Sequence, residues 1–141
     1  MRVFTGIVAT GYGLATPNLA PVVTLIEART SLTNLAPGTL NVKICEEYIV
    51  QSDVVINPDE YPFNRESNLG ETIKIQRCLV AGYKALIIRP DSHEIGAGRF
   101  HGKSYLELMG QKHFRTLLGL GDESVVRVQV EGAAAWWRSG I

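Results

Sequence analysis

The sequence predicts a mainly β protein, a small closed or partly closed barrel with one or two short helices. Short runs of alternating or β-branched residues recur along the chain, and glycine and proline turns separate them. Strands and helices do not alternate in the rhythm of a parallel α/β sheet. At 141 residues the chain is long enough to bury a core without a metal or a disulfide. We expect residues 1–132 to form a single domain and 133–141 a C-terminal tail.

The N-terminal part is expected to hold two strands and a helix. Residues 3–9 are rich in β-branched side chains, with Val3, Thr5, Ile7 and Ala9 on one face, which predicts a mostly buried strand. Pro17 and Pro21 limit the helical pattern that follows to a start near Pro21 and an end near Ser31. After the Pro37-Gly38 turn, residues 39–44 alternate polar with apolar side chains and predict a half-buried strand.

The remaining elements are expected in the following order. Residues 57–70 predict a long loop around a short extended piece at 60–63, because prolines, acids and asparagines gather there. The runs 72–80 and 83–88 flank Ala81-Gly82 and predict a tight hairpin. Further along the chain we expect a strand at 104–109, a short helix from Phe114 closing at Gly119, and a last strand over residues 126–130. Trp136 and Trp137 either pack locally or belong to a frayed tail.

Charge and composition exclude several classes of function. Fourteen basic and fourteen acidic residues give a formal net charge of zero, which argues against a duplex nucleic-acid binder or a membrane-surface protein. No run approaches the ~18 apolar residues of a membrane span, and the N-terminus lacks a signal-peptide pattern. We therefore expect a cytoplasmic protein with small-molecule partners; the oligomeric state is left open. Cys45 and Cys78 have no metal-site spacing, so we expect reduced thiols in the core.

A loop with two glycines follows the first strand. The segment Gly11-Tyr12-Gly13-Leu14-Ala15-Thr16-Pro17 could direct backbone N–H groups at a phosphate, or it could be a plain turn. It matches neither the dinucleotide-binding fingerprint nor the Walker A loop.

Two polar residues at alternate positions of a strand suggest a metal site. Thr39 and Asn41 project from the same face, while Leu40 and Val42 enter the core. Two neutral hard oxygens suit a magnesium ion whose other ligands are phosphate oxygens and water. The alternative is a Thr/Asn pair on a solvated strand face.

Further candidates for chemistry lie near the C-terminal end. Glu107 shares a strand face with Tyr105 and Met109, so its carboxylate either stands in a partly apolar pocket as a proton acceptor or is simply exposed. The run Lys112-His113-Phe114-Arg115 either binds an anion or forms a solvated helix face. His93 and His101 lack the spacing of metal ligands.

The order of these features resembles the archaeal-type CTP-dependent riboflavin kinases, from about Val3 to Glu131. The resemblance rests on four segments of this chain: Gly11-Tyr12-Gly13, Pro37-Gly38-Thr39-Leu40-Asn41-Val42, His93 with Leu106-Glu107-Leu108-Met109, and residues 114–122. The Pro-Gly-Thr-Leu-Asn-Val segment is the most specific.

The resemblance implies a cradle-loop β-barrel that transfers the terminal phosphate of CTP to the 5′-hydroxyl of riboflavin, giving FMN and CDP. It implies that the loop from Gly11 to Pro17 and the run Lys112–Arg115 hold the nucleotide, and that Thr39 and Asn41 hold Mg²⁺. It also implies that Glu107 contacts the ribityl chain as orienting group or base. Asp91 aligns with a flavin-side threonine of the family, and residues 96–102 resemble an insertion. The alternative function is a non-catalytic flavin- or nucleotide-binding barrel that has lost the phosphate loop; a regulatory or nucleic-acid-binding barrel is less compatible with the neutral charge.

Overall fold

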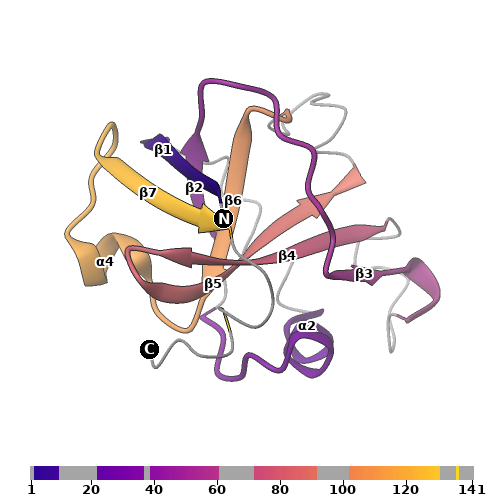
Figure 1. Cartoon of the computed structure of the whole chain (residues 1–141). Helices are drawn as coiled ribbons and strands as arrows, with labels where there is room; N and C mark the ends of the chain where they lie inside the picture. The colour runs from indigo at the N-terminus through magenta and orange to yellow at the C-terminus, as the bar shows by residue number, and fades with distance from the viewer. Residues whose placement is uncertain are drawn as a thin grey trace.

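Antiparallel strands make up most of the described chain in this computed structural model, which covers residues 2–9, 22–36, 39–60, 72–91, 102–130 and 136 (Figure 1). The elements in these ranges are β1 (Arg2–Ala9), α2 (Val23–Thr30), β2 (Leu40–Lys43), β3 (Val54–Ile56), the 3-10 helix η2 (Pro58–Glu60), β4 (Ile73–Val80), β5 (Tyr83–Pro90), β6 (Tyr105–Gly110), α4 (Phe114–Leu118) and β7 (Val125–Val130). None of the helices in these ranges has the length and apolarity to cross a membrane. The mainly β class with short helices is confirmed.

Six of the strands close into a barrel. The sheet order is β3-β4-β5-β6-β2-β1-β7, and β7 pairs back onto β4 from Cys78↔Val130 to Val80↔Val128. The opposite end of β4 pairs with β3, from Ile73 to Ile75. Because β4 pairs with β7 near one end and with β3 near the other, it both closes the barrel and carries the seventh strand.

Alternation along the strands builds two apolar cores. Leu106 and Leu108 point into the barrel interior, while Met109 joins a second cluster with Ile88 and Ile26 of α2. In Figure 1, α2 lies outside the barrel beside the β3 end of β4. The predicted division of residues 104–109 into two faces is therefore correct.

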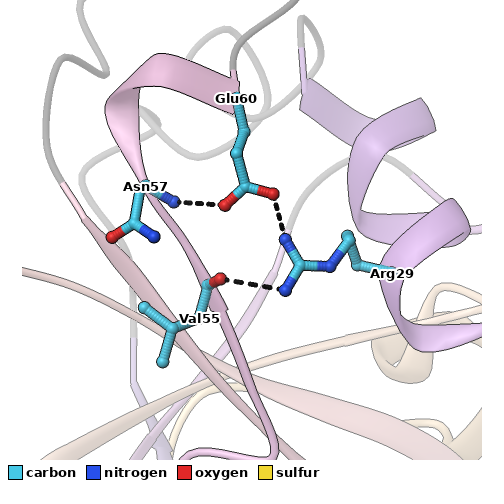
Figure 2. Close-up of polar contacts among 4 residues, drawn as sticks. All are labelled: Arg29, Val55, Asn57 and Glu60. Carbon is cyan, nitrogen blue, oxygen red and sulfur yellow. Dashed lines mark hydrogen bonds and ion pairs between the residues drawn. The ribbon is translucent and has the colours of Figure 1, made fainter.

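A polar contact fixes α2 against the added strand. The guanidinium of Arg29 donates to the Glu60 carboxylate and, at 3.2 Å, to the carbonyl of Val55 (Figure 2). The backbone N–H of Asn57 donates to the same carboxylate at 2.8 Å. One arginine thus joins the helix, β3 and η2, and fixes their relative orientation.

Several sequence predictions need correction. Strand β1 is half-buried rather than mostly buried, since Ile7 on its outer face is 49% exposed. Cys45 is exposed rather than in the core, because it lies in the bend after β2; Cys78 is buried as predicted. Strand β3 was not predicted at all.

Other predictions agree with the structure or lie beyond its described part. The hairpin turns at Ala81 and Gly82, both with positive φ. Helix α2 begins at Val23, two residues past Pro21. Trp136 is buried, and its indole N–H donates to the Cys78 carbonyl at 3.1 Å. Glu60, the first residue of the extended piece expected at 60–63, belongs instead to the 3-10 helix η2. The rest of that piece, Trp137 and residues 96–101 of the expected insertion at 96–102 lie outside the described residues.

Close packing of β1 on β2 generates a stability prediction. A Cβ on Gly6 would lie 2.3 Å from Val42 Cγ1 and 2.8 Å from the Lys43 carbonyl oxygen, so neither side chain nor backbone has room for it. We expect Gly6→Ala to lower the free energy of unfolding by about 2 kcal/mol in urea denaturation. The matched control is Gly121→Ala, whose added methyl meets nothing within 4 Å. Equal stability of the two variants would contradict the packing described here.

Candidate functional site

Strand β2 brings the proposed metal ligands beside the proposed base. Asn41 pairs with Glu107 of β6 on one side and with Ala9 of β1 on the other. Directly paired residues of antiparallel strands project from the same face, so the Asn41 amide and the Glu107 carboxyl leave the sheet side by side. Leu40 and Val42 lie in the barrel core as predicted. The core thus turns Thr39 and Asn41 toward the opposite face.

The side-chain oxygens of Thr39 and Asn41 are buried and unsatisfied. Neither Thr39 Oγ1 nor Asn41 Oδ1 has a hydrogen-bond partner within the described ranges, and neither is accessible to solvent. Asn41 as a whole is only 8% exposed, which contradicts a solvated strand face. A buried polar group without a partner costs about 1–3 kcal/mol, so native proteins rarely keep one without a function. Two such atoms on neighbouring positions of one face are a candidate ligand pair.

Burial changes the acidity of Glu107. The residue is 8% exposed, and burial raises its pKa to about 8, although the buried Arg89 guanidinium lowers it. Arg89 is itself held by the carbonyls of Tyr48, at 2.7 Å, and Tyr105, at 2.9 Å. The residue is therefore buried rather than exposed. A pKa near neutrality suits a group that accepts and returns a proton.

A cavity of about 80 Å³ joins Thr39 to the cationic segment. It lies where β2, β6 and α4 meet, and its lining comprises Ala36, Thr39, Leu40, Leu108, Gly110, Lys112, His113, Phe114 and Arg115. The structure thus brings together two site segments that are far apart in sequence. Asn41, two residues beyond Thr39, and its paired residue Glu107 do not line this cavity.

The four residues of the segment 112–115 occupy different environments. Lys112 and His113 are exposed, and His113 precedes the first residue of α4. The Phe114 ring is buried in the barrel core, so its main contribution is to packing. Arg115 donates through Nη2 to Asp122 Oδ1 at 2.7 Å and to the Ala9 carbonyl at 3.3 Å. The sequence predicted the cationic segment but not these two partners of Arg115.

Two hydrogen bonds that the sequence did not indicate lie beside the cavity. The Ala36 N–H donates to the Gly110 carbonyl at 2.8 Å, and the Gln111 side-chain amide donates to the Thr33 carbonyl at 2.8 Å. These bonds tie the segment before β2 to the end of β6. They fix the approach to Thr39 relative to α4.

The remaining predicted site residues are the loop from Gly11 to Pro17 and Asp91. The loop from Gly11 to Pro17 lies outside the described residues, although Ala9, at the end of β1, is described. Asp91 is exposed at the end of β5, three residues beyond Ile88, which pairs with Glu107. Its N–H donates to the Thr72 carbonyl at 3.1 Å.

The fold and the site define a small antiparallel barrel with a cation-lined cavity beside two buried, unsatisfied oxygens and a buried carboxyl group. The family model of the CTP-dependent riboflavin kinases, described as a domain of unknown function, DUF120, matches residues 30–130. The chain therefore belongs to this family, and the match includes every element from the end of α2 to β7. A search of curated proteins finds no match to the chain.

The buried carboxyl group generates a prediction about pH and stability. Because the pKa of Glu107 rises from 4.5 to about 8 on folding, the folded protein keeps a proton that the unfolded chain loses between these pH values. Stability that this proton provides below pH 4.5 is lost as pH rises through 8, by up to a few kcal/mol. We expect Glu107→Gln, which cannot ionise, to flatten this decline in metal-free thermal unfolding.

The control for this experiment is Glu47→Gln, which removes an exposed carboxyl group. It should follow the wild-type pH dependence. A Glu107→Gln variant whose melting temperature runs parallel to that of the wild type from pH 5 to pH 9 would show that Glu107 is not a carboxyl group with a raised pKa.

Proposed function

We propose that this protein is a magnesium-dependent riboflavin kinase that transfers the terminal phosphate of CTP to the 5′-hydroxyl of riboflavin, giving FMN and CDP. The observation that carries the proposal is the pair of unsatisfied oxygens on Thr39, which lines the cavity with the cationic residues, and on Asn41, which is paired with Glu107. Family membership supports the reaction class.

The chemistry of the donor pair fits Mg²⁺. A hydroxyl and an amide oxygen are neutral hard ligands, and Mg²⁺ in nucleotide sites takes few protein ligands because phosphate oxygens and water complete its octahedron. Thr39 and Asn41 would hold the ion. Bound there, Mg²⁺ would neutralise phosphate charge. The stability lost to two unsatisfied oxygens in the free protein is then recovered on binding.

We propose that the nucleotide phosphates bind at the cationic wall of the cavity. Lys112 and Arg115 bring positive charge to the cavity that Thr39 also lines, and His113 adds a ring nitrogen. The loop from Gly11 to Pro17 follows Ala9, whose carbonyl accepts from Arg115, so backbone N–H groups of this loop are proposed as further phosphate donors. Phosphoryl transfer depends mainly on such positioning and charge neutralisation.

Glu107 is the proposed base, and riboflavin is proposed to lie between it and Asp91. The phosphorus–oxygen bond to the β-phosphate breaks, a bond to the riboflavin 5′-oxygen forms, and the hydroxyl proton passes to the Glu107 carboxylate. Because burial raises the pKa of this group to about 8 in the free protein, the carboxylate is its minor form at pH 7. Activity should therefore rise with pH through this range.

The same pKa favours a second candidate function, a flavin- or nucleotide-binding barrel without catalysis. A protonated Glu107 is a hydrogen-bond donor, and a buried neutral acid can hold a ribityl hydroxyl without removing its proton. Such a protein would bind riboflavin or nucleotide but form no FMN.

The direct test separates these candidates. Purified protein is incubated with riboflavin, Mg²⁺ and each of the four nucleoside triphosphates in turn, and FMN is measured by chromatography. We expect FMN with CTP above the other donors. Binding of riboflavin without FMN from any donor would establish the non-catalytic alternative.

Removing a proposed metal ligand should leave stability unchanged or raised while it weakens Mg²⁺-dependent activity. Thr39→Val replaces the hydroxyl with a methyl of similar size and removes one unsatisfied buried oxygen. We expect the free protein to be as stable as the wild type or more so, because the Thr39 hydroxyl makes no hydrogen bond among the described residues. The Mg²⁺ concentration at half-maximal FMN formation should rise about tenfold or more. Thr39→Ser, which keeps the hydroxyl, is the control.

Asn41→Ala should show the same rise in Mg²⁺ requirement. Truncation of Asn41 to alanine also leaves a cavity in the sheet, which lowers stability by itself. The effect of removing an unsatisfied oxygen on stability is therefore measured more directly with Thr39→Val. Unchanged Mg²⁺ dependence in both Thr39→Val and Asn41→Ala would place the ion elsewhere.

A further inference from the structure

A single guanidinium connects three segments of the chain at the wall of the cavity. Arg115 belongs to α4, its Nη2 donates to the carbonyl of Ala9 at the end of β1, and the same nitrogen is 2.7 Å from Asp122 Oδ1 in the turn before β7. Arg115 also lines the cavity beside Thr39, whereas Asp122 does not. The ion pair with Arg115 therefore connects Asp122 to the cavity wall.

The backbone around this contact is already tied together. Val8 N–H donates to the Ser124 carbonyl and Glu123 N–H donates to the Val8 carbonyl, each at 2.8 Å. The Leu120 N–H donates to the Arg115 carbonyl at 2.8 Å. The positions of α4, the turn and the end of β1 are thus set by main-chain bonds. The ion pair with Asp122 adds a restraint on the direction of the Arg115 side chain.

Asp122 is negatively charged, so it does not attract an anionic ligand directly. A carboxylate close to a proposed phosphate site repels the ligand, and the exposed fractions of the two side chains, 41% for Arg115 and 57% for Asp122, make their ion pair a weak source of stability. The benefit that we attribute to the ion pair is that it restrains the Arg115 side chain. A long, partly exposed arginine that is already oriented loses less conformational entropy when a ligand binds.

We propose that Asp122 is a positioning residue for the nucleotide: through its ion pair it holds the Arg115 guanidinium across the end of β1, in the cavity wall, ready for the phosphates. This inference rests on the proposed function, because it takes the cavity as the phosphate site. It assigns a role to a residue outside the cavity. Arg115 also contacts the carbonyl of Ala9, which precedes the loop from Gly11 to Pro17 in the sequence.

The test compares two variants that remove the same charge one residue apart. Asp122→Ala removes the partner of Arg115, while Glu123→Gln removes the neighbouring exposed carboxylate and leaves that partner in place. Affinity for Mg²⁺-CTP is measured by calorimetry. We expect Asp122→Ala to weaken binding about three- to tenfold and Glu123→Gln to leave it unchanged or slightly tighter. Asp122→Asn, which keeps an acceptor, should fall between wild type and Asp122→Ala.

A double-variant comparison shows whether Asp122 acts through Arg115. Arg115→Gln should weaken binding more than Asp122→Ala, and adding Asp122→Ala to it should cause no further loss. If Asp122→Ala binds CTP as tightly as wild type, or more tightly, the proposal is overturned. A further loss in the double variant would equally overturn it, since Asp122 would then act independently of Arg115.

A measurement on the ligand-free protein separates this proposal from the proposed function. The order parameter of the Arg115 side-chain Nε–H by NMR should be high in wild type and Glu123→Gln and lower in Asp122→Ala. An unchanged order parameter in Asp122→Ala contradicts the positioning role even if the wild type makes FMN. If the wild type binds CTP but makes no FMN, the kinase function is contradicted. The role of Asp122 is then still decided by comparing the CTP affinities of Asp122→Ala and Glu123→Gln.

Discussion

The register of β2 between β1 and β6 is the constraint on which the site depends. Leu40 and Val42 are packed into the barrel, so Thr39 and Asn41 have to face the other way. A slip of one residue would turn every side chain of the strand to the opposite face and bury Asn41 among apolar groups. The same pairing places Asn41 directly opposite Glu107. A packing requirement of the core thereby fixes the distance between proposed metal ligand and proposed base.

Polar groups of the proposed site destabilise the free protein, and a bound ligand would remove part of that cost. Unsatisfied oxygens on Thr39 and Asn41 and a buried carboxyl group at Glu107 all oppose folding, and the barrel around them offsets that cost. Buried Arg89 limits the cost at Glu107, since its charge favours the carboxylate form. Functional sites in which a fold tolerates local instability commonly show this balance.

Patterns within single strands were predictable from the sequence, and contacts between distant segments were not. Period-2 alternation correctly assigned the faces around Leu106 and Leu40, because side-chain direction in a strand is a local property. Closure of β7 onto β4, and the bond from Ala36 to Gly110, join segments whose adjacency no local pattern encodes. The partners of Arg115 were missed for the same reason. The three-residue strand β3 is too short to show a period.

The location of the bound metal tests the central claim most directly. Crystals of the protein grown with CDP and Mn²⁺, as a magnesium substitute with an anomalous signal, would reveal the ion in an anomalous difference map. The account predicts a peak about 2 Å from both Thr39 Oγ1 and Asn41 Oδ1, with nucleotide phosphate oxygens completing the coordination. A peak coordinated by other residues, with CDP bound and both oxygens still unsatisfied, would contradict it.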